Sequence, residues 1–391
     1  LFQIIVQSQN GTIPAFYIND FPKYEWRGAM LDAARQFFPA ASVKRFIDLL
    51  WIHRLNRFHW HLTDDQGWRL PVKGLPDLVR IGAWRDDNTT NYGVTGGYYS
   101  EENIKEIVQY AERRGITVIP EIDMPGHTVS ASAAYPYLNC RRKKMQVETR
   151  WGIFEDVLCA GRETTYTFIE KVITEAARLF PGPYMHIGGD ETPPDRWAEC
   201  PDCRERLNSE GLSKPEELQG YFTNRAAKMV LSIGKRPVVW DEVLEYQPPK
   251  ETIIVSWRNA SYGKAATEKG YDVIMAPSVR ACYFDQKHLN VEWEPGRLGV
   301  CTVKDSAEYD PSGAESGGNG KVLGAQGQLW SEAVDSVRLA EYLMYPRLSA
   351  LADTVWAGSP RVWSDAAERL EGHREMLRRL GVLVFPGSFE E

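Results

Sequence analysis

The chain has 391 residues, of which 43% are hydrophobic and 25% are charged, and its formal net charge is −7 at pH 7. These values are typical of a globular protein with one large domain or two smaller ones. The negative charge and a sequence pI of about 5.7 argue against nucleic acid or an anionic membrane as the main partner. No run of about 18 apolar residues occurs, so we expect no transmembrane helix.

The first residues indicate a processed or trimmed chain. The sequence begins at Leu1 rather than at Met, and the opening LFQIIVQS is too short for a signal sequence. We expect residues 1–22 to form a lead-in segment or the remnant of a preceding domain, and residues 23–391 to form the main domain. No internal repeat divides this second part.

Six cysteines leave the redox compartment open. Cys200 and Cys203 have the Cys-x-x-Cys spacing of metal and redox sites, but a second such pair is missing from the sequence. We therefore expect these two residues to be structural or locally disulfide-bonded rather than zinc ligands. Cys140 and Cys159 could pair across a loop. The sequence predicts neither a metal nor a cofactor.

Eight short runs rich in β-branched and aromatic residues predict strands, and segments with helical periodicity separate most of them. The expected strands are 27–35, 57–64, 115–123, 184–190, 236–242, 252–258, 272–278 and 322–330. The expected helices are 42–54, 101–113, 163–180, 216–233, 260–269 and 336–350. In the second of these helices Ile104, Ile107 and Ala111 recur at helical spacing, and Ser100 precedes it as an N-cap.

This alternation predicts an α/β fold with a parallel sheet, and eight strands predict its closure into a (β/α)8 TIM barrel. Long irregular connections at 128–162, 192–215 and 279–321 each follow a strand, so we expect long βα-loop insertions. A doubly wound open sheet is the alternative. It requires a glycine-rich phosphate loop after the first strand, which the segment RGAMLDAAR does not provide.

Polar and aromatic side chains gather at the C-terminal ends of the expected strands, where the loops of a barrel form the mouth of a pocket. In chain order they are Arg35, Asp64, Asp65, Asp123, His127, Asp190, Glu191, Trp240, Asp241, Glu242, Trp257, Tyr283, Asp285, Trp330 and Glu332. This mixture suits a polyol, because charged groups bind hydroxyls and aromatic rings stack on the C–H face of a sugar. The sequence therefore predicts one site for a carbohydrate.

Two adjacent acids, Asp190 and Glu191, close the fourth expected strand in the sequence YMHIGGDETPPD. Alternation along this strand would place His186, Gly188 and Asp190 on one face, with Glu191 free to curl over the rim. We expect the two glycines to leave room for the substrate. Because like charges separate the pKa values of neighbouring acids, we expect a raised pKa for Glu191 as general acid and a lowered pKa for Asp190 as permanent anion.

Five motifs in order resemble the family-20 glycoside hydrolases, the β-N-acetylhexosaminidases. They are FHWHLTDDQGWR at 58–69, DMPGH at 123–127, HIGGDE at 186–191, VVWDE at 238–242 and GQLWSE at 327–332. The likeness covers residues 23–391 and implies a (β/α)8 catalytic domain, which a small α+β domain usually precedes. It also implies an exported protein, located in the periplasm, outside the cell or in a lysosome.

The resemblance implies an exo-acting, retaining enzyme that releases terminal β-linked N-acetylglucosamine or N-acetylgalactosamine from an oligosaccharide or glycoconjugate. The substrate's own 2-acetamido oxygen would be the nucleophile and would give an oxazolinium intermediate. Glu191 would move the proton, Asp190 would orient the acetamide N–H, and Tyr283 would bind the acetamide oxygen. The further implied site residues are Asp64 and His127, which would tune Glu191; Trp240, Trp257 and Trp330, which would line the pocket; and Arg35, Asp285 and Glu332, which would hold hydroxyls.

Two other functions remain as alternatives. His59 and His61 form an H-x-H pair found in metal-dependent barrel hydrolases, but zinc ligands should close a strand, so packing in the core is the preferred interpretation. His186 is likewise expected inside the barrel. A sugar-binding protein without catalysis is disfavoured because both Asp190 and Glu191 are present.

Overall fold

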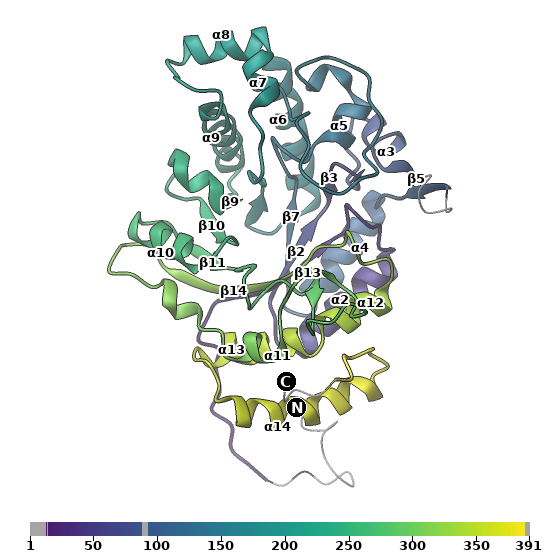
Figure 1. Ribbon diagram of the computed structural model, residues 1–391, viewed down its shortest axis with the longest axis vertical. Coiled ribbons are helices and arrows are strands. Elements are labelled where there is room, and N and C mark those ends of the chain that lie inside the picture. The colour runs from purple at the N-terminus through teal and green to yellow at the C-terminus, as the bar shows by residue number, and fades with distance from the viewer. Residues whose placement is uncertain (1–12, 14, 88–92, 388–391) are drawn as a thin grey trace.

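A closed barrel of eight parallel strands forms the centre of the computed structural model, which describes residues 13, 15–87 and 93–387 (Figure 1). Around the barrel the strands are β1 (Trp26–Asp32), β2 (Arg57–His61), β7 (Thr117–Glu121), β8 (Tyr184–His186), β9 (Arg236–Trp240), β10 (Ile253–Ser256), β11 (Val273–Met275) and β14 (Val322–Leu329). The last strand pairs with the first, with Trp26 opposite Gly324, so the barrel closes. The predicted (β/α)8 fold is confirmed, and the open sheet is wrong.

Five predicted helices are confirmed, with ends that differ from the prediction by at most two residues. They are α2 (Ala40–Ile52), α4 (Glu101–Glu112), α6 (Glu163–Leu179), α9 (Glu217–Ser232) and α10 (Ala260–Glu268). Ser100 caps α4, because its side chain accepts a hydrogen bond from the Asn103 backbone amide. The sixth prediction is wrong in one respect: the segment contains two helices, α12 (Val337–Met344) and α13 (Arg347–Ala357), separated at Pro346, which has no N–H to continue the first helix.

Short elements occupy the three long loops that were expected to be irregular, and also a long connection between β2 and α4 that was not among them. Those before α6 are β3 (Thr63–Asp64), β4 (Gly67–Trp68), α3 (Asp77–Arg80), β5 (Trp84–Asp87), β6 (Gly93–Gly96) and α5 (Val129–Ala134). Those after it are α7 (Asp195–Glu199), α8 (Pro201–Ser209), β12 (Gln286–Lys287), β13 (Arg297–Val300) and α11 (Val303–Ala307). The predicted βα-loop insertions are therefore present and partly ordered into secondary structure.

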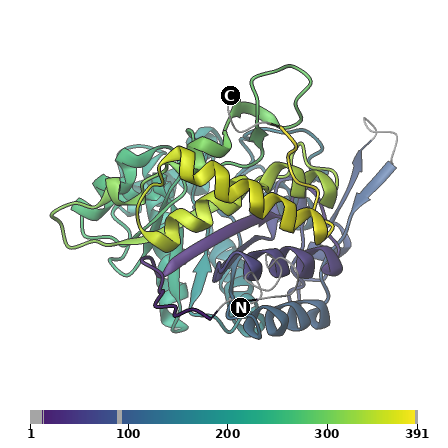
Figure 2. The same ribbon diagram turned by 90° about the horizontal axis from the view of Figure 1, so that it is seen from below.

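A last helix, α14 (Trp363–Arg379), was not predicted and lies at the bottom of the molecule as drawn in Figure 1. Seen from below, the yellow C-terminal helices lie over the purple strand β1 (Figure 2). Lys23, just before this strand, donates its backbone N–H to the Trp356 carbonyl on α13 at 2.8 Å. The start of the barrel is thus held against the end of the chain.

The division at residue 22 stays a prediction. Residues 13 and 15–22 form no helix or strand, whereas residues 1–12 and 14 lie outside the described part of the chain. Asp20 in this lead-in contacts the barrel domain, since its carboxylate accepts a hydrogen bond from the Trp356 indole at 2.7 Å.

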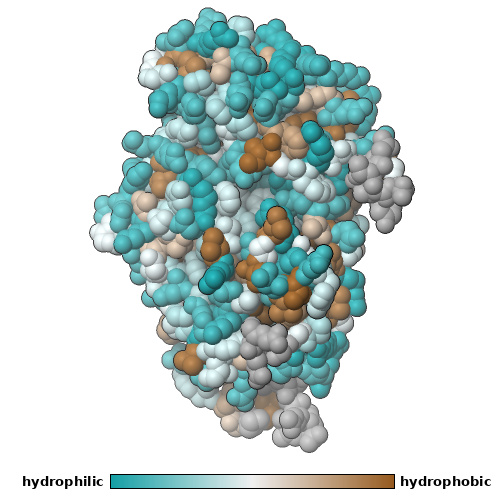
Figure 3. All heavy atoms as spheres, in the orientation of Figure 1, coloured by the Kyte–Doolittle hydropathy of each residue, from teal (hydrophilic) through white to brown (hydrophobic). Residues whose placement is uncertain are grey.

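Apolar side chains fill both the layer between strands and helices and the inside of the barrel. The inner cluster includes Met30, Ile119, Val238, Val255 and Ile274, and it continues upward into Trp240, Tyr283 and Trp330. On the face drawn in Figure 3, hydrophobic residues form small separate patches in a mostly hydrophilic surface. No helix of the described residues is both long and apolar enough to cross a membrane.

Candidate active site

All eleven predicted site residues lie at the C-terminal ends of the barrel strands, and each of the eight strands contributes at least one. Following the barrel from β1, they are Arg35, Asp64, His127, Asp190, Glu191, Trp240, Trp257, Tyr283, Asp285, Trp330 and Glu332. Contacts connect nine of them, and Arg297 joins the other two, Asp285 and Glu332. The structure therefore brings together the set that the sequence predicted.

The backbone turns sharply between β8 and the acid pair. The strand ends at His186, and left-handed φ angles follow at Gly188 (67°), Gly189 (97°) and Glu191 (40°). The expected strand alternation from His186 to Asp190 is therefore wrong, because these residues are not part of an extended strand.

The two glycines were expected to make room for a substrate, but they do not. A Cβ atom at Gly188 would lie 1.6 Å from Oδ1 of Asp123, and one at Gly189 would lie 2.4 Å from Cγ2 of Val243. Glycine is required here by the close packing of two protein side chains and by the positive φ angles. The glycines thus position the acid pair rather than a ligand.

His127 lies between two pairs of acids. Its Nδ1 is 3.2 Å from Oδ1 of Asp64 and 3.2 Å from Oδ2 of Asp65, while its Nε2 is 3.4 Å from Oε2 of Glu191 and 3.7 Å from Oδ2 of Asp190. Burial acts to lower the pKa of His127. The carboxylates of Asp64, Asp65 and Glu191, of which Asp64 contributes most, outweigh burial and raise this pKa well above 6.5. An imidazolium therefore faces the acid pair.

The pKa values of the two acids shift in the opposite directions from those expected. Burial, and then the charge of Asp123, raises the pKa of Asp190 well above 3.8. Burial also acts to raise the pKa of Glu191, but its hydrogen bond to His127 and the charge of that residue outweigh burial and lower the pKa below 4.5. The expectation considered only the repulsion between the two acids, whereas their neighbours decide the outcome.

Asp123, two residues after β7, was among the polar residues expected at the barrel mouth, but no role was assigned to it. It is buried, and neither of its carboxylate oxygens has a hydrogen-bond partner among the described residues. Burial raises its pKa from 3.8 to about 7. Among the predicted site residues, Oδ1 of Asp190, Oδ1 of Asp285 and Oε2 of Glu332 are also buried without a hydrogen-bond partner in the described structure. These carboxylate oxygens can accept hydrogen bonds from a polar ligand.

Four aromatic rings form a wall beside these acids. The rings of Trp257 and Tyr283 stack at 6.3 Å, Tyr283 is 6.5 Å from Trp330, and Trp330 is 5.8 Å from Trp240. The outermost ring, Trp257, is fixed by its indole N–H, which donates to Oε2 of Glu242 at 2.9 Å. This wall provides the flat apolar surface on which a sugar ring stacks.

Two arginines hold the remaining acids. Nη1 of Arg35 lies 2.8 Å from Oδ2 of Asp64, and its guanidinium lies over the Trp330 ring at 5.0 Å. Arg297, on β13, donates to Asp285 at 2.7 Å and to Glu332 at 3.4 Å. Arg297 was not predicted, because it lies inside a long loop, away from any expected strand end.

A second layer of polar groups lies below the site, around Glu121. Oε1 of Glu121 accepts from the Trp240 indole at 2.9 Å and is 3.0 Å from Nδ1 of His186, and its Oε2 is 2.9 Å from Nε2 of His59 and in contact with His61. The three histidines are buried, as predicted.

The H-x-H metal alternative is not supported by this arrangement. In the described structure the ligand atoms of His59 cluster with those of Glu121 and His186, whereas those of His61 cluster with Glu121 and Asp123. The two histidines of the pair thus fall in different groups of possible ligands, although both contact Oε2 of Glu121.

Residues 24–359 match the family model of the glycosyl hydrolase family 20 catalytic domain. The chain belongs to glycosyl hydrolase family 20.

Curated relatives of this family-20 domain include a β-hexosaminidase from Porphyromonas gingivalis, which is 40% identical over 365 residues and aligns with 92% of this chain and 47% of that protein. A β-hexosaminidase from Vibrio furnissii is 38% identical over 357 residues, which are 88% of this chain and 58% of that protein. The family-20 domain thus spans about half the length of these relatives.

Solved structures agree with this assignment. The Vibrio harveyi GH20 exo-β-N-acetylglucosaminidase in complex with N-acetylglucosamine superposes with a TM-score of 0.85 at 34% identity, covering 95% of this chain and 60% of that chain. The β-N-acetylhexosaminidase from Bacteroides fragilis superposes with a TM-score of 0.84 at 32% identity, covering 95% of this chain and 74% of that one.

Proposed function

We propose that this family-20 domain is an exo-acting, retaining β-N-acetylhexosaminidase, which releases terminal β-linked N-acetylglucosamine or N-acetylgalactosamine by substrate-assisted catalysis. The names of the relatives support this substrate class. One observation carries the proposal: the partly exposed Glu191 carboxylate and the buried Asp190 carboxylate both lie against His127, beside a wall of aromatic rings. One acid can thus exchange protons at the rim while the other faces the interior of the pocket.

In the first step the protonated Glu191 donates its proton to the glycosidic oxygen, and the bond between this oxygen and C1 breaks. The carbonyl oxygen of the 2-acetamido group forms a bond to C1 from the opposite face, which gives a cyclic oxazolinium ion and a free alcohol. In the second step Glu191 removes a proton from water as the water oxygen attacks C1, and the bond between C1 and the acetamido oxygen breaks, which restores the 2-acetamido group. Two inversions at C1 leave the product in the original β configuration.

Asp190 serves as the partner of the acetamide N–H in this proposal. In the ligand-free pocket its pKa is raised by burial and by the charge of Asp123. When the acetamide nitrogen becomes positively charged in the oxazolinium ion, it favours an ionised Asp190. Burial raises the pKa of Asp123 to about 7, so this neighbour adds little negative charge when it is protonated. An intramolecular nucleophile held in this way has an effective molarity on the order of 10⁵ M or more.

Glu191 must be protonated to act, although His127 lowers its pKa in the ligand-free protein. Its side chain is 35% exposed, so a bound sugar and leaving group would displace water from it and raise its pKa. After proton transfer, the imidazolium of His127 stabilises the carboxylate that forms. The same histidine therefore strengthens Glu191 as an acid once the substrate covers it.

The remaining residues bind the sugar. Burial raises the pKa of Tyr283 well above 10, so its hydroxyl stays protonated and can donate to the acetamide oxygen. Asp285 and Glu332 each present a buried oxygen without a protein partner to the sugar hydroxyls. Trp240, Trp257 and Trp330 surround the sugar face and the acetamide methyl group. These contacts hold a chain end and so support exo-action.

Aryl β-glycosides of N-acetylglucosamine, N-acetylgalactosamine and glucose test this proposal. We expect hydrolysis of one or both amino sugars, at least ~10³-fold slower cleavage of the glucoside, which lacks the nucleophile, and strong inhibition by a thiazoline that mimics the oxazolinium ion. The first product seen by NMR should be the β anomer. Equal rates for the glucoside would refute substrate assistance, and sugar binding without any turnover would support the non-catalytic alternative.

A further inference from the structure

Four cysteines from two different loops meet beside the barrel: Cys140, Cys159, Cys200 and Cys203, here called the four-cysteine cluster. The first two belong to the loop after β7. Cys200 joins α7 to α8, and Cys203 lies in the first turn of α8, after β8. All four are free thiols. The pairings considered from the sequence, within Cys140 and Cys159 or within Cys200 and Cys203, are therefore wrong. The missing partner pair of the Cys-x-x-Cys motif is supplied by the preceding loop.

The sulfur positions match a tetrahedral metal site. The Sγ–Sγ distances are 3.7 Å between Cys140 and Cys203, 3.6 Å between Cys159 and Cys203, and 3.9 Å between Cys159 and Cys200, and all four sulfurs lie within 4.8 Å of one another. Zinc bound by four thiolates at about 2.3 Å places them about 3.8 Å apart. A disulfide would require about 2.05 Å.

A cation lies beside the cluster. Three of the four cysteines are buried, and Nη2 of Arg162 lies 4.0 Å from Sγ of Cys200. Zinc with four thiolates carries a net charge of −2, which an adjacent guanidinium offsets.

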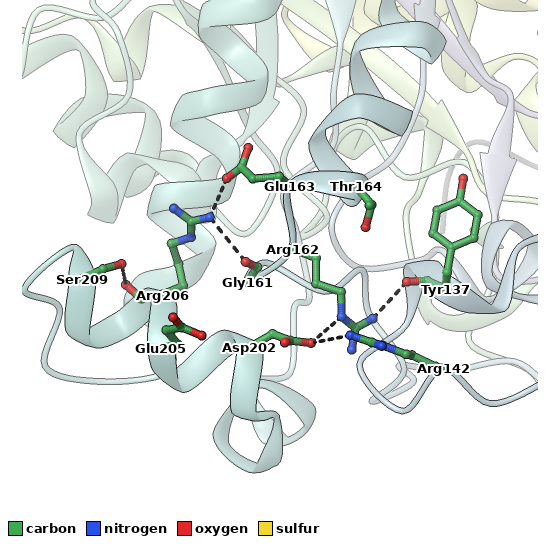
Figure 4. A pocket seen from close by; sticks show the side chains of 10 residues that line it. All are labelled: Tyr137, Arg142, Gly161, Arg162, Glu163, Thr164, Asp202, Glu205, Arg206 and Ser209. Carbon is green, nitrogen blue, oxygen red and sulfur yellow. Dashed lines mark hydrogen bonds and ion pairs between the residues drawn. The ribbon is translucent and has the colours of Figure 1, made fainter.

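Arg162 also joins the two loops. It donates to the Cys140 carbonyl at 2.7 Å and the Tyr137 carbonyl at 2.9 Å, and it pairs with Asp202 of the Cys-x-x-Cys turn. Figure 4 shows this side chain between Tyr137 and Asp202 in a polar surface pocket. The arginine is thus placed to order the loops before any metal binds.

We propose that the four-cysteine cluster binds one structural zinc ion. Zn²⁺ forms four bonds to sulfur, releases the protons of the thiols that were still protonated, and undergoes no redox change. Because four protein ligands complete a tetrahedron, no position remains open for substrate or water. The site is structural rather than catalytic, and it does not depend on the sugar specificity proposed above.

This ion would fasten the loop that carries His127 to the loop that carries Glu191. Leu158, next to Cys159, donates its N–H to the Pro125 carbonyl at 3.0 Å and accepts from the Trp197 indole at 2.9 Å. Pro125 is two residues before His127, and Trp197 belongs to α7, which follows the acid pair. The lack of a side chain at Gly161 lets this loop approach the turn that carries Asp202, because a Cβ atom at residue 161 would lie 2.2 Å from the Asp202 backbone.

Metal analysis of the purified protein, expressed with zinc and separated from free metal, tests the proposal. We expect about one zinc per chain in the parent, near zero in Cys203→Ala, and about one in Cys203→His, because histidine can replace a thiolate in a structural zinc site. Cys301→Ala is the matched control, since Cys301 is a buried free cysteine outside the cluster. It should keep the metal.

A second measurement covers the case in which Cys203→Ala does not fold. Cobalt(II) added to metal-free parent protein should give the charge-transfer absorption of tetrahedral thiolate ligation, and zinc should abolish it. A parent protein that contains no zinc and carries two disulfides in non-reducing peptide maps would overturn the proposal. Zinc retained in Cys203→Ala would also overturn it. Neither readout uses turnover, so failure here is distinct from failure of the hydrolase proposal.

Discussion

Two carboxylates at the end of the same strand, Glu121 and Asp123, lie in opposite environments although both are almost completely buried. Both oxygens of Glu121 contact partners, namely His59, His61, His186 and Trp240. Burial opposes its ionisation, yet the histidines outweigh burial and hold its pKa well below 4.5. Asp123 has no partner for either oxygen among the described residues, and its pKa is raised to about 7.

This comparison separates the barrel interior into a lower and an upper polar layer. In the lower layer, the charged carboxylate of Glu121 is paired with other side chains of the protein. In the upper layer, around Asp123 and Asp190, several buried oxygens lack a protein partner. Burial alone therefore does not set the role of an acid. The partners do, since unpaired buried groups reduce stability and are retained where a ligand completes them.

A substitution in the upper layer should reduce the activity of the protein without reducing the stability of its fold. Replacing Glu191 by Gln is expected to slow the cleavage of oligosaccharides about 10²–10⁴-fold, the range of general acid catalysis. Activated aryl glycosides should suffer less in the first step, because their leaving groups need no proton. The free energy of unfolding should change by less than about 0.5 kcal/mol. A parent-like rate on disaccharides would contradict the role of Glu191.

A substitution in the lower layer should instead reduce the stability of the fold. Glu121→Ala removes one partner from a buried charge network, so we expect the free energy of unfolding in urea at pH 7 to fall by about 3–5 kcal/mol. The exposed Glu112→Ala on α4 is the control and should change stability little. If both variants have the same stability, the lower layer does not support the barrel.

Replacing Asp123 by Asn should show that ionisation of this buried carboxyl group destabilises the fold. The pKa of this carboxyl is raised from 3.8 in the unfolded chain to about 7 in the fold, so its contribution to stability is fully present below pH 3.8 and is lost as pH rises toward 7. Asparagine cannot ionise and avoids this loss. The variant should therefore gain stability relative to the parent between pH 4 and pH 8, by up to about 4 kcal/mol.

Measuring the free energy of unfolding of the variant and the parent at pH 4 and at pH 8 checks the sign of this change in stability. A variant whose stability relative to the parent is the same at pH 4 and pH 8 would show that Asp123 does not carry the raised pKa.

The smallest effect is expected at Arg297, which is shared between Asp285 and Glu332. Arg297→Met should leave these two acids free to move, so KM should rise about tenfold, or about 1.4 kcal/mol, with a smaller change in kcat. Arg338→Met on α12 is an exposed control. A fall in kcat without a change in KM would place Arg297 in the chemical step instead of in binding.

Local sequence patterns were sufficient for most of the architecture. β-Branched and aromatic runs located all eight barrel strands. Polar residues at the strand ends predicted one site at the barrel mouth, and the resemblance to family 20 selected eleven of the residues there, which the structure places at that mouth. The missed features depend on other segments. The helix α14 is rich in charged residues, so its apolar face is weakly marked in the sequence. Arg297 reaches the site only because β13 folds back over the barrel mouth.

The sequence by itself determined the strand order, the adjacency of Asp190 and Glu191 and the presence of His127, because these follow from local periodicity and motif order. The tertiary structure decided the protonation of the acids, because His127 and Asp123 come from a different loop than the acid pair. It also decided that four cysteines spread from 140 to 203 converge on one point. Electrostatic shifts and metal geometry depend on distances of a few ångströms, which only the packing of one loop against another fixes.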